Sequence, residues 1–368
     1  MFHRSVIWPL LSLLALVAGC AQGTSAYRVL GAGVQRPERA VVLFFVDGMD
    51  RRVFHRLVEQ GDLPNFERIF VTGGVGVEHA IASMPAITYP NAVSLITGRF
   101  PGHHGVLGNR WFDRLTLIDQ DYGSAATYRS VNRDFESATL YELMPDRLTV
   151  NVQGHTRRGV THTFDHWALS GIDWFLGSYT SVDQRVGACI DRVVNLARRE
   201  GRWPTVLTAY FPGVDEVGHR YGPGSKRYLD ALRNADRQIG RIYDGVEASG
   251  MGSRTYYVLV SDHGLVATPS ARSVDLNAWL EDRCKLRVYR GHVEDARYDR
   301  RRWRLRRFDA VVVDGAFRRA AVHLRGSAGW AGSADDALIE RVLRPGTQTL
   351  CGTGFQPVEP ADHLCGTG

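Results

Sequence analysis

Apolar and polar positions along the chain form two alternating patterns. Continuous apolar runs that end in polar residues are typical of strands buried on both faces of a parallel sheet. Such runs are AVVLFFVDG from position 40, PTVLTAYF at 204–211 and TYYVLVSDHG at 255–264. Between the last two, apolar residues recur at helical spacing over 225–250. Strand, helix, strand predicts a crossover unit of an α/β fold, with a central, mostly parallel sheet flanked by helices on both faces.

The composition fits a globular protein with material for a large core. The chain has 368 residues, of which 44% are hydrophobic and 23% charged. No Pro/Ser-rich or low-complexity linker divides its middle, so we expect one catalytic domain over residues 39–345. The repeated CGTG at 351–354 and 365–368 is unusual for a packed final element. We therefore expect an atypical tail over 346–368, which a truncated reading frame would also produce.

The formal charge of +6 depends strongly on one arginine-rich segment, RYDRRRWRLRRFD at 297–309. Alternation of Arg with Trp303, Leu305 and Phe308 predicts an edge strand with one basic face. A patch for nucleic acid or phospholipid is the alternative. Because an edge strand with one basic face accounts for the arginines, we infer no nucleic-acid binding from the charge.

The N-terminus has the layout of an export signal. Arg4 precedes an apolar run too short to span a bilayer comfortably, which predicts a signal peptide over residues 1–19. The sequence Val-Ala-Gly-Cys at 17–20 resembles a bacterial lipoprotein box, with Cys20 as the lipidated residue and 20–38 as a tether. We therefore expect an exported protein, lipid-anchored on the periplasmic or cell-surface side of a bacterial membrane. A plain signal peptide with a chance cysteine is the alternative.

Cysteine usage leaves the redox state of the exported domain open. Besides Cys20, the chain contains Cys189, Cys284, Cys351 and Cys365. Disulfides form in the compartment expected for an exported protein, but the pairing does not follow from sequence.

Three predicted strands end in residues that can bind metal. Asp47 ends the first, Asp215 and His219 follow the second, and Asp262 and His263 end the third. Any one of these acids could instead cap a helix or shape a turn. Together at one edge of a sheet, carboxylates and imidazoles suit zinc or a similar divalent ion. Asp215 and His219 are four residues apart, so one helical turn would direct both toward one point.

Thr88 lies at a predicted helix start in AITYPNAVSLITG, because Pro90 suits the first turn. Its hydroxyl could help to bind an anion at the helix N-terminus, or could simply cap the helix. A threonine hydroxyl is a poor nucleophile without a base, and no GxSxG elbow or triad is present. A bound metal could activate it instead.

Four ordered motifs carry a resemblance to a known family. The motifs VDG, TYPNAVSLITGRFPGHHGVLGN, DEVGHRYGP and SDHG, within residues 40–266, resemble the nucleotide pyrophosphatase/phosphodiesterase branch of the alkaline phosphatase superfamily. The resemblance implies an alkaline phosphatase-like fold and a threonine nucleophile that bridges two zinc ions. It further implies a metal-dependent phosphoric ester hydrolase, of phosphodiesterase or nucleotide pyrophosphatase type, acting on a phosphate ester or nucleotide.

Site residues transfer from the family motif by motif. One metal would be held by Asp47, Thr88, Asp262 and His263, and the other in part by Asp215 and His219. Asn109 matches the asparagine that donates to a non-bridging phosphoryl oxygen. The implied reaction is attack of Thr88 on phosphorus, a covalent threonyl-phosphoryl intermediate and its hydrolysis, with the ions about 3.5–4 Å apart. His103 and His104 belong to an HG turn and are not expected to be ligands.

Two neighbouring enzyme classes can be weighed from what the chain contains. A sulfatase needs an oxidisable Cys or Ser followed by xPxR, whereas this chain has Thr88 followed by Tyr, Pro, Asn and Ala. A phosphomonoesterase of the same superfamily remains an alternative, with Arg157 or Arg158 as the extra cation. No motif places either arginine in the site.

The second metal site lacks an obvious third histidine. The chain after His263 offers His292, His323 and His363, none in the family's C-terminal HG motif. A lipid-anchored pseudoenzyme that binds phosphate or metal without turnover is therefore a further alternative. The leaving group, natural substrate and oligomeric state do not follow from the sequence.

Overall fold

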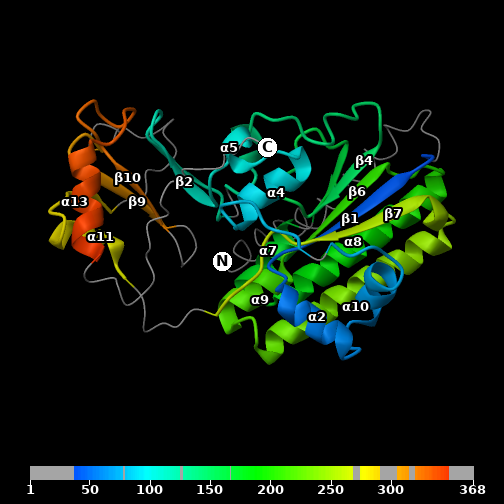
Figure 1. The fold of residues 1–368 in the computed structure, drawn as a ribbon. Helices are drawn as coiled ribbons and strands as arrows, with labels where there is room; N and C mark the ends of the chain where they lie inside the picture. The colour runs from blue at the N-terminus through cyan, green and yellow to red at the C-terminus, as the bar shows by residue number, and fades with distance from the viewer. Residues whose placement is uncertain are drawn as a thin grey trace, which may run out of the picture. The chain divides into compact units, whose positions relative to one another are not determined.

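The protein forms two compact units, each with its own sheets. The computed structural model describes residues 37–77, 79–124, 127–165, 167–267, 274–290, 305–314 and 320–347 (Figure 1). Unit 1 consists of the described residues of 1–109 and 122–267, and unit 2 of those of 110–121 and 268–368. The expected catalytic range of 39–345 includes parts of both units.

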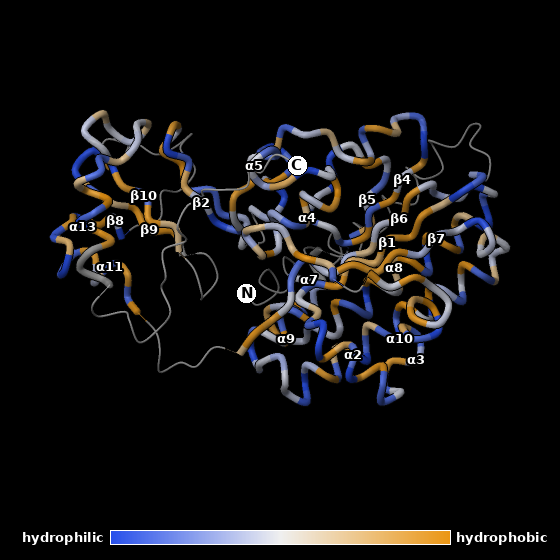
Figure 2. Tube along the Cα trace, viewed as in Figure 1, coloured by the Kyte–Doolittle hydropathy of each residue, from blue (hydrophilic) through white to orange (hydrophobic). Residues whose placement is uncertain are grey.

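A five-stranded, all-parallel sheet forms the centre of unit 1, in the order β5-β4-β6-β1-β7. Its strands are β1 (Ala40–Val46), β4 (Thr149–Val152), β5 (His162–Phe164), β6 (Val206–Phe211) and β7 (Thr255–Val260). The three strands predicted from apolar runs are therefore neighbours, β6-β1-β7. Figure 2 shows this sheet as largely hydrophobic. The central strand β6 is buried at every position, as predicted for a strand covered on both faces. The prediction is wrong for the edge strand β7, where Tyr256 is 60% and Val258 37% exposed.

Helices surround the sheet of unit 1. They are α2 (Arg51–Glu59), α3 (Pro64–Phe66), the π-helix η1 (Glu67–Val71), α4 (Thr88–Thr97), α5 (Pro101–His104), α6 (Val131–Asp134), α7 (Trp167–Phe175), α8 (Tyr179–Glu200), α9 (Gly213–Tyr221), α10 (Lys226–Ala248) and the 3-10 helix η2 (Gly252–Arg254). In Figure 1, α8, α9 and α10 lie below the sheet, and α4 and α5 lie on its other side.

The side chains of β1 show why helices pack against both faces of the sheet. Val42 and Phe44 are buried in the main core with residues of α8 and α10, whereas Leu43 packs with Ile96 of α4 and Val206. Successive residues of a strand point to opposite faces, so a strand apolar at every position requires a helical layer on each side. The α/β fold, with a parallel sheet between helices, is confirmed and is consistent with an alkaline phosphatase-like architecture.

The described residues of unit 2 include two small sheets and the helices α11 and α13. Its elements are the antiparallel pair β2 (Arg110–Asp113) and β3 (Ile118–Asp121), the sheet of β8 (Val288–Tyr289), β9 (Ala310–Asp314) and β10 (Ala320–Leu324), and the helices α11 (Leu276–Asp282) and α13 (Asp336–Thr347). A small core of Phe112, Val311, Val313 and Trp330 joins β2 to β9.

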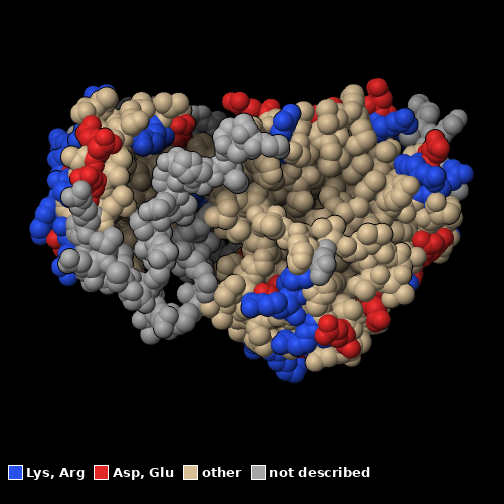
Figure 3. Space-filling model, in the orientation of Figure 1, with Lys and Arg blue, Asp and Glu red and all other residues tan. Residues whose placement is uncertain are grey.

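The arginine-rich segment is described only at its end. Residues 297–304 lie outside the described part. Leu305 is helical and residues 306–309 are turn or irregular structure before β9, so the predicted edge strand is wrong for these positions. The reason is packing, because Leu305 is buried and its carbonyl accepts a hydrogen bond from the indole of Trp330 at 3.1 Å. Figure 3 shows basic and acidic side chains interspersed on the visible face of unit 1.

The predicted signal peptide and Cys20 lie outside the described residues, as do most of the tether and the tail. None of the described helices has the length and apolar character of a membrane span. Cys189 and Cys284 are buried and form no disulfide among the described residues, whereas Cys351 and Cys365 lie outside them.

Candidate active site

Two of the predicted ligands follow neighbouring parallel strands. Asp47 comes after β1 and Asp262 after β7, and their side chains are 3% and 0% exposed. Asp262 Oδ1 accepts hydrogen bonds from the backbone N–H groups of Gly48 (3.2 Å) and His263 (2.9 Å). Gly48 follows β1 and His263 follows β7, so these two bonds hold the Asp262 carboxylate between the ends of the two strands.

His263 brings its imidazole between the two acids. Its Nε2 lies 3.6 Å from Asp47 Oδ1 and 3.3 Å from Asp262 Oδ2, and its side chain is only 8% exposed. Its Nδ1 lies 3.1 Å from the carbonyl oxygen of Gly264, which favours the tautomer with a proton on Nδ1. Nε2 is then the nitrogen available to a metal, and a backbone carbonyl that orients the ring in this way is a common outer partner of metal-binding histidines.

Asp215 and His219 lie on α9, which follows β6. Their four-residue spacing places His219 Nε2 3.2 Å from Asp215 Oδ2, as one helical turn predicts. Asp215 is buried, whereas the His219 side chain is 38% exposed. The hydrogen bond to Asp215 raises the pKa of His219 above its ordinary value, since it stabilises the imidazolium form.

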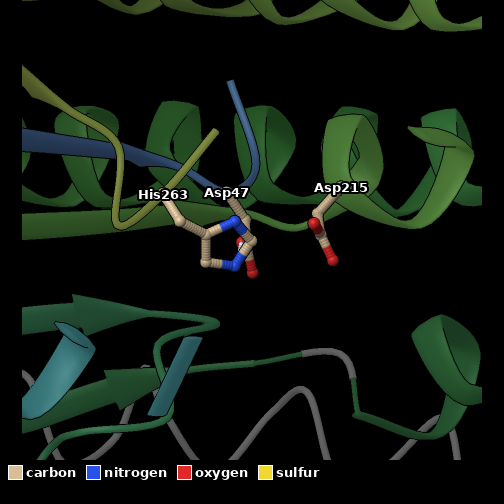
Figure 4. Close-up of side chains that lie close together, drawn as sticks. All are labelled: Asp47, Asp215 and His263. Carbon is tan, nitrogen blue, oxygen red and sulfur yellow. Dashed lines mark ion pairs between the residues drawn. The ribbon is translucent and has the colours of Figure 1, made fainter. Parts of the chain in front are cut away.

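Residues of both predicted metal sites meet at one point. Asp47, Asp215 and His263 each offer a ligand atom, and these atoms lie within 4.8 Å of one another (Figure 4). In Figure 4 the three side chains project toward the same space from the two strand ends and from α9. The sheet edge thus brings together groups that are up to 216 positions apart in the chain.

The chemistry of this group fits a divalent cation. Three buried carboxylate oxygens have no hydrogen-bond donor among the described residues, namely Asp47 Oδ1, Asp215 Oδ1 and Asp262 Oδ2. Burial, with the nearby carboxylates of Asp262 and Asp215, raises the pKa of Asp47 well above its usual range. Buried acids without donors are costly unless a cation compensates them, and this donor set suits zinc.

Gly48 of the VDG motif makes the close approach possible. Its φ of +64° lies in the left-handed region, and a Cβ at this position would fall 2.4 Å from Asp215 Oδ1. A side chain there would be strained and would displace the Asp215 carboxylate. The glycine is therefore required by both backbone conformation and space.

Thr88 lies beside the same group. It is the first residue of α4, and its Oγ1 is 3.3 Å from His263 Nε2. The helix is preceded by Ile87, and no side-chain capping bond is present there within the described part of the chain. The simple capping role left open from sequence is therefore not what the hydroxyl does.

Asn109 lies next to the helix start that carries Thr88. Its Oδ1 accepts a hydrogen bond from the backbone N–H of Tyr89 at 2.9 Å. With Oδ1 used in this way, the amide's Nδ2 is the atom left to donate to a ligand.

Sequence reasoning missed two buried residues around the site. Asn91 donates through Nδ2 to the carbonyls of Ser83, Pro85 and Ile87, which fixes the loop that leads into α4. Tyr210 of β6 donates from its hydroxyl to Asp47 Oδ2 at 2.5 Å. Tyr210 sits in an apolar run, so only the pairing of β1 with β6 could have drawn attention to it.

His104 has a structural place, in keeping with its exclusion as a ligand. It is fully buried, and its Nδ1 accepts from the backbone N–H of Val106 at 3.2 Å. Nε2 therefore carries the proton and lies 3.1 Å from the carbonyl oxygen of Pro90, in the first turns of α4. The imidazole joins α5 to α4 as a neutral group.

The other cations and histidines considered from sequence have their own partners or lie elsewhere. Arg157 pairs with Asp165 at 2.8 Å, and Arg158 pairs with Glu142 at 2.9 Å. His323 belongs to unit 2, where its ring packs edge-on against Phe112, and burial lowers its pKa to about 4. His292 and His363 lie outside the described residues.

Most of the chain is similar to a known protein family. Residues 41–330 match the model of the type I phosphodiesterase / nucleotide pyrophosphatase family. An uncharacterized pyrophosphatase/phosphodiesterase of Schizosaccharomyces pombe is 25% identical over 67% of this chain and 48% of its own length. Ectonucleotide pyrophosphatase/phosphodiesterase family member 7 of Mus musculus is 24% identical over 75% of this chain and 58% of its own length. Family member 1 of Homo sapiens is 24% identical over 71% of this chain and 27% of its own length.

The matched part of the chain spans less than two thirds of the length of these relatives. The family match itself covers well over half of this chain, from β1 to beyond the last strand of unit 2. The chain belongs to the type I phosphodiesterase/nucleotide pyrophosphatase family.

Proposed function

We propose that this protein is a metal-dependent phosphoric ester hydrolase of the phosphodiesterase/nucleotide pyrophosphatase type, with Thr88 as its nucleophile and two divalent ions, zinc by preference. The observation that carries the proposal is the position of the Thr88 hydroxyl. It lies 3.3 Å from His263 Nε2, beside buried acids whose oxygens have no donor among the described residues. A cation bound by these groups would lie beside the hydroxyl and could activate it.

The proposed ligands divide into two sets. One ion would be held by Asp47, Thr88, Asp262 and His263, and the other by Asp215 and His219 with a ligand still to be identified. Bound ions would supply the positive charge that stabilises the threonine alkoxide and the departing oxygen. Asp47 and Asp215 lie close enough for their oxygens to face one shared space, which supports a paired site.

The chain's own groups would orient the phosphoryl group. Thr88 begins a ten-residue helix, whose first N–H groups and dipole favour an anion at that end. Asn109, held through Oδ1 by the Tyr89 N–H, would present Nδ2 to a non-bridging phosphoryl oxygen. Donors fixed before the substrate arrives stabilise developing charge without reorganising, and this is the main protein contribution in phosphoryl transfer.

A diester is favoured over a monoester. A monoester carries an extra negative charge, which phosphomonoesterases of the superfamily neutralise with Lys or Arg. The two arginines considered for that role, Arg157 and Arg158, are occupied by Asp165 and Glu142. The names of the relatives from Mus musculus and Homo sapiens support nucleotide diesters or pyrophosphates as the first substrates to test.

Hydrolysis by the purified, zinc-loaded protein tests this proposal. We expect bis-p-nitrophenyl phosphate to be cleaved with a higher kcat/KM than p-nitrophenyl phosphate, and about two zinc ions per chain by elemental analysis. A strong preference for the monoester contradicts the diesterase assignment. One ion per chain without turnover of either ester supports a binding protein instead.

We also propose that the enzyme works outside the cytoplasm, attached to a membrane through lipid on Cys20. The supporting feature is the Val-Ala-Gly-Cys sequence after an apolar run. Metabolic labelling with a radioactive fatty acid is expected to mark the full-length chain and not the Cys20→Ala variant. Equal labelling of both would contradict the anchor.

A further inference from the structure

The hydroxyl of Tyr210 contacts one oxygen of Asp47 and leaves the other for the site. The Tyr210 hydroxyl donates to Asp47 Oδ2 at 2.5 Å, within the buried interior. Asp47 Oδ1 is buried, has no hydrogen-bond partner among the described residues and faces His263 Nε2 at 3.6 Å. The two oxygens of one carboxylate therefore have different surroundings.

This contact follows from the register of two parallel strands. Phe45 of β1 is paired with Tyr210 of β6, and their rings pack 4.9 Å apart. Asp47 is two residues beyond Phe45, so its side chain points to the same face of the sheet as Tyr210. The backbone N–H of Asp47 also donates to the carbonyl of Phe211 at 3.0 Å, which holds the strand end in place.

The ring of Tyr210 is itself fixed. It is 4% exposed and lies between Phe45 and the partly buried ring of His155, whose centroid is 4.5 Å away at an interplanar angle of 60°. His155 also contacts Tyr89, the residue after Thr88, at 4.8 Å. A phenol packed on both sides has little freedom to turn its hydroxyl away from Asp47.

We propose that Tyr210 is a positioning residue for the metal site: its hydroxyl holds Asp47 Oδ2, so that Oδ1 is presented to the cation. This inference rests on the proposed function, because it assumes that Asp47 binds metal. Partners that orient a ligating carboxylate are part of a metal site, and their loss typically weakens metal affinity by about 10–100-fold.

Tyr210→Phe tests the role, since it removes only the hydroxyl. Tyr141→Phe is a matched control, because Tyr141 is equally buried in unit 1 and its hydroxyl is bonded to Thr208 Oγ1 at 2.7 Å. Zinc affinity of the full chain would be measured by competition with a chromophoric chelator, and the free energy of unfolding of the metal-free chain by urea titration.

We expect Tyr210→Phe to weaken zinc affinity by about 10–100-fold and Tyr141→Phe to leave it within about twofold, although both lose a buried hydrogen bond. With cobalt in place of zinc, the visible spectrum of Tyr210→Phe is expected to change in intensity or position, while that of Tyr141→Phe matches the wild type.

The results also separate this inference from the proposed function. Unchanged zinc affinity in Tyr210→Phe, or an equal loss in both variants, overturns the positioning role and leaves the proposed function standing. A wild-type chain that binds no zinc or cobalt overturns both.

Discussion

The two halves of the candidate site are built in different ways. Asp47, Asp262 and His263 follow neighbouring parallel strands, and their side chains are at most 8% exposed. Asp215 and His219 belong to a nine-residue helix, and the His219 side chain is 38% exposed. The strand half is fixed by the sheet and by backbone N–H bonds to Asp262, whereas the helix half has an open side where solvent, substrate or another ligand can approach.

This difference indicates a division of labour. Groups at the ends of paired strands cannot move without breaking the sheet, so they suit the part of the site that would hold the proposed nucleophile, Thr88, in place. A pair on one helical turn needs only that helix, and its more exposed member can adapt to different partners. The following predictions, from the largest expected effect to the smallest, test this contrast.

Thr88→Ala is expected to give the largest effect. Removing the proposed nucleophile should lower kcat for a diester by at least about a thousandfold, while zinc content changes little because Asp47, Asp262 and His263 remain. Steady-state hydrolysis of bis-p-nitrophenyl phosphate measures the rate. Thr97→Ala, near the other end of α4, is the control and should keep the wild-type rate. Full activity in Thr88→Ala would exclude Thr88 as nucleophile.

Asp262→Asn should weaken the strand half severely. The carboxylate accepts two backbone N–H groups through Oδ1 and faces His263 through Oδ2, so loss of its charge affects both the metal and the strand ends. We expect zinc affinity to fall by at least about 100-fold, more than for loss of a supporting partner. Asp50→Asn is the matched control, because Asp50 is a helix cap at the same edge and Asn also caps well. Equal losses in both variants would contradict the assignment.

His219→Ala should weaken the helix half more mildly. Because its side chain is partly exposed, water can replace the imidazole, and we expect about a tenfold loss of zinc affinity, confined to one of two ions. Isothermal titration calorimetry of the metal-free chain would resolve the two binding steps. His55→Ala, an exposed histidine on α2, should bind as the wild type does. A loss of both ions in His219→Ala would mean that the halves are not separable.

The smallest effect is expected on the stability of the metal-free chain. The pKa of Asp47 is raised in the folded state by burial and by neighbouring acids, so its contribution to stability is complete below the unfolded pKa and is lost as pH rises through the folded pKa. In chelator near neutral pH, Asp47→Asn should therefore raise Tm by about 2–4 °C, the shift that roughly 1 kcal/mol gives in a domain of this size.

Two comparisons check whether the ionised Asp47 carboxylate causes this change in Tm. With saturating zinc the order should reverse, since the wild type gains the stabilisation of bound metal. At pH 4 in chelator the wild type and Asp47→Asn should melt at similar temperatures. A variant that is less stable than the wild type in chelator near neutral pH would show that the Asp47 carboxylate is not under electrostatic strain.

Much of the site could be predicted from the chain. The apolar runs predicted β1, β6 and β7, and parallel strands share an edge, so Asp47, Asp215 and Asp262 were expected near one another. The four-residue spacing placed His219 against Asp215. The predicted helix start drew attention to Thr88, and the family resemblance added its role as nucleophile and added Asn109. In the structure Thr88 lies beside His263, and Asn109 accepts from the Tyr89 N–H.

Other features could not be predicted. Tyr210 and Asn91 lie in segments that indicate a strand and a helix, and nothing in their local sequence shows a polar partner. Residues 305–309 were predicted as part of a strand because Arg and apolar residues alternate there, but they form no strand, since Leu305 is buried and its carbonyl is bonded to Trp330. Local alternation reports which side chains are apolar and not how they pack.

The sequence alone determined the class of fold, the strand ends that carry acids and histidines, and the order of the motifs, because these follow from periodicity and from residue type. Only the tertiary structure decided which atoms meet. The Tyr210 hydroxyl donates to Asp47, which is 163 positions away in the chain, and Gly48 leaves room for the Asp215 carboxylate beside it. Such contacts depend on strand register and helix placement, which the packing of the whole core sets together.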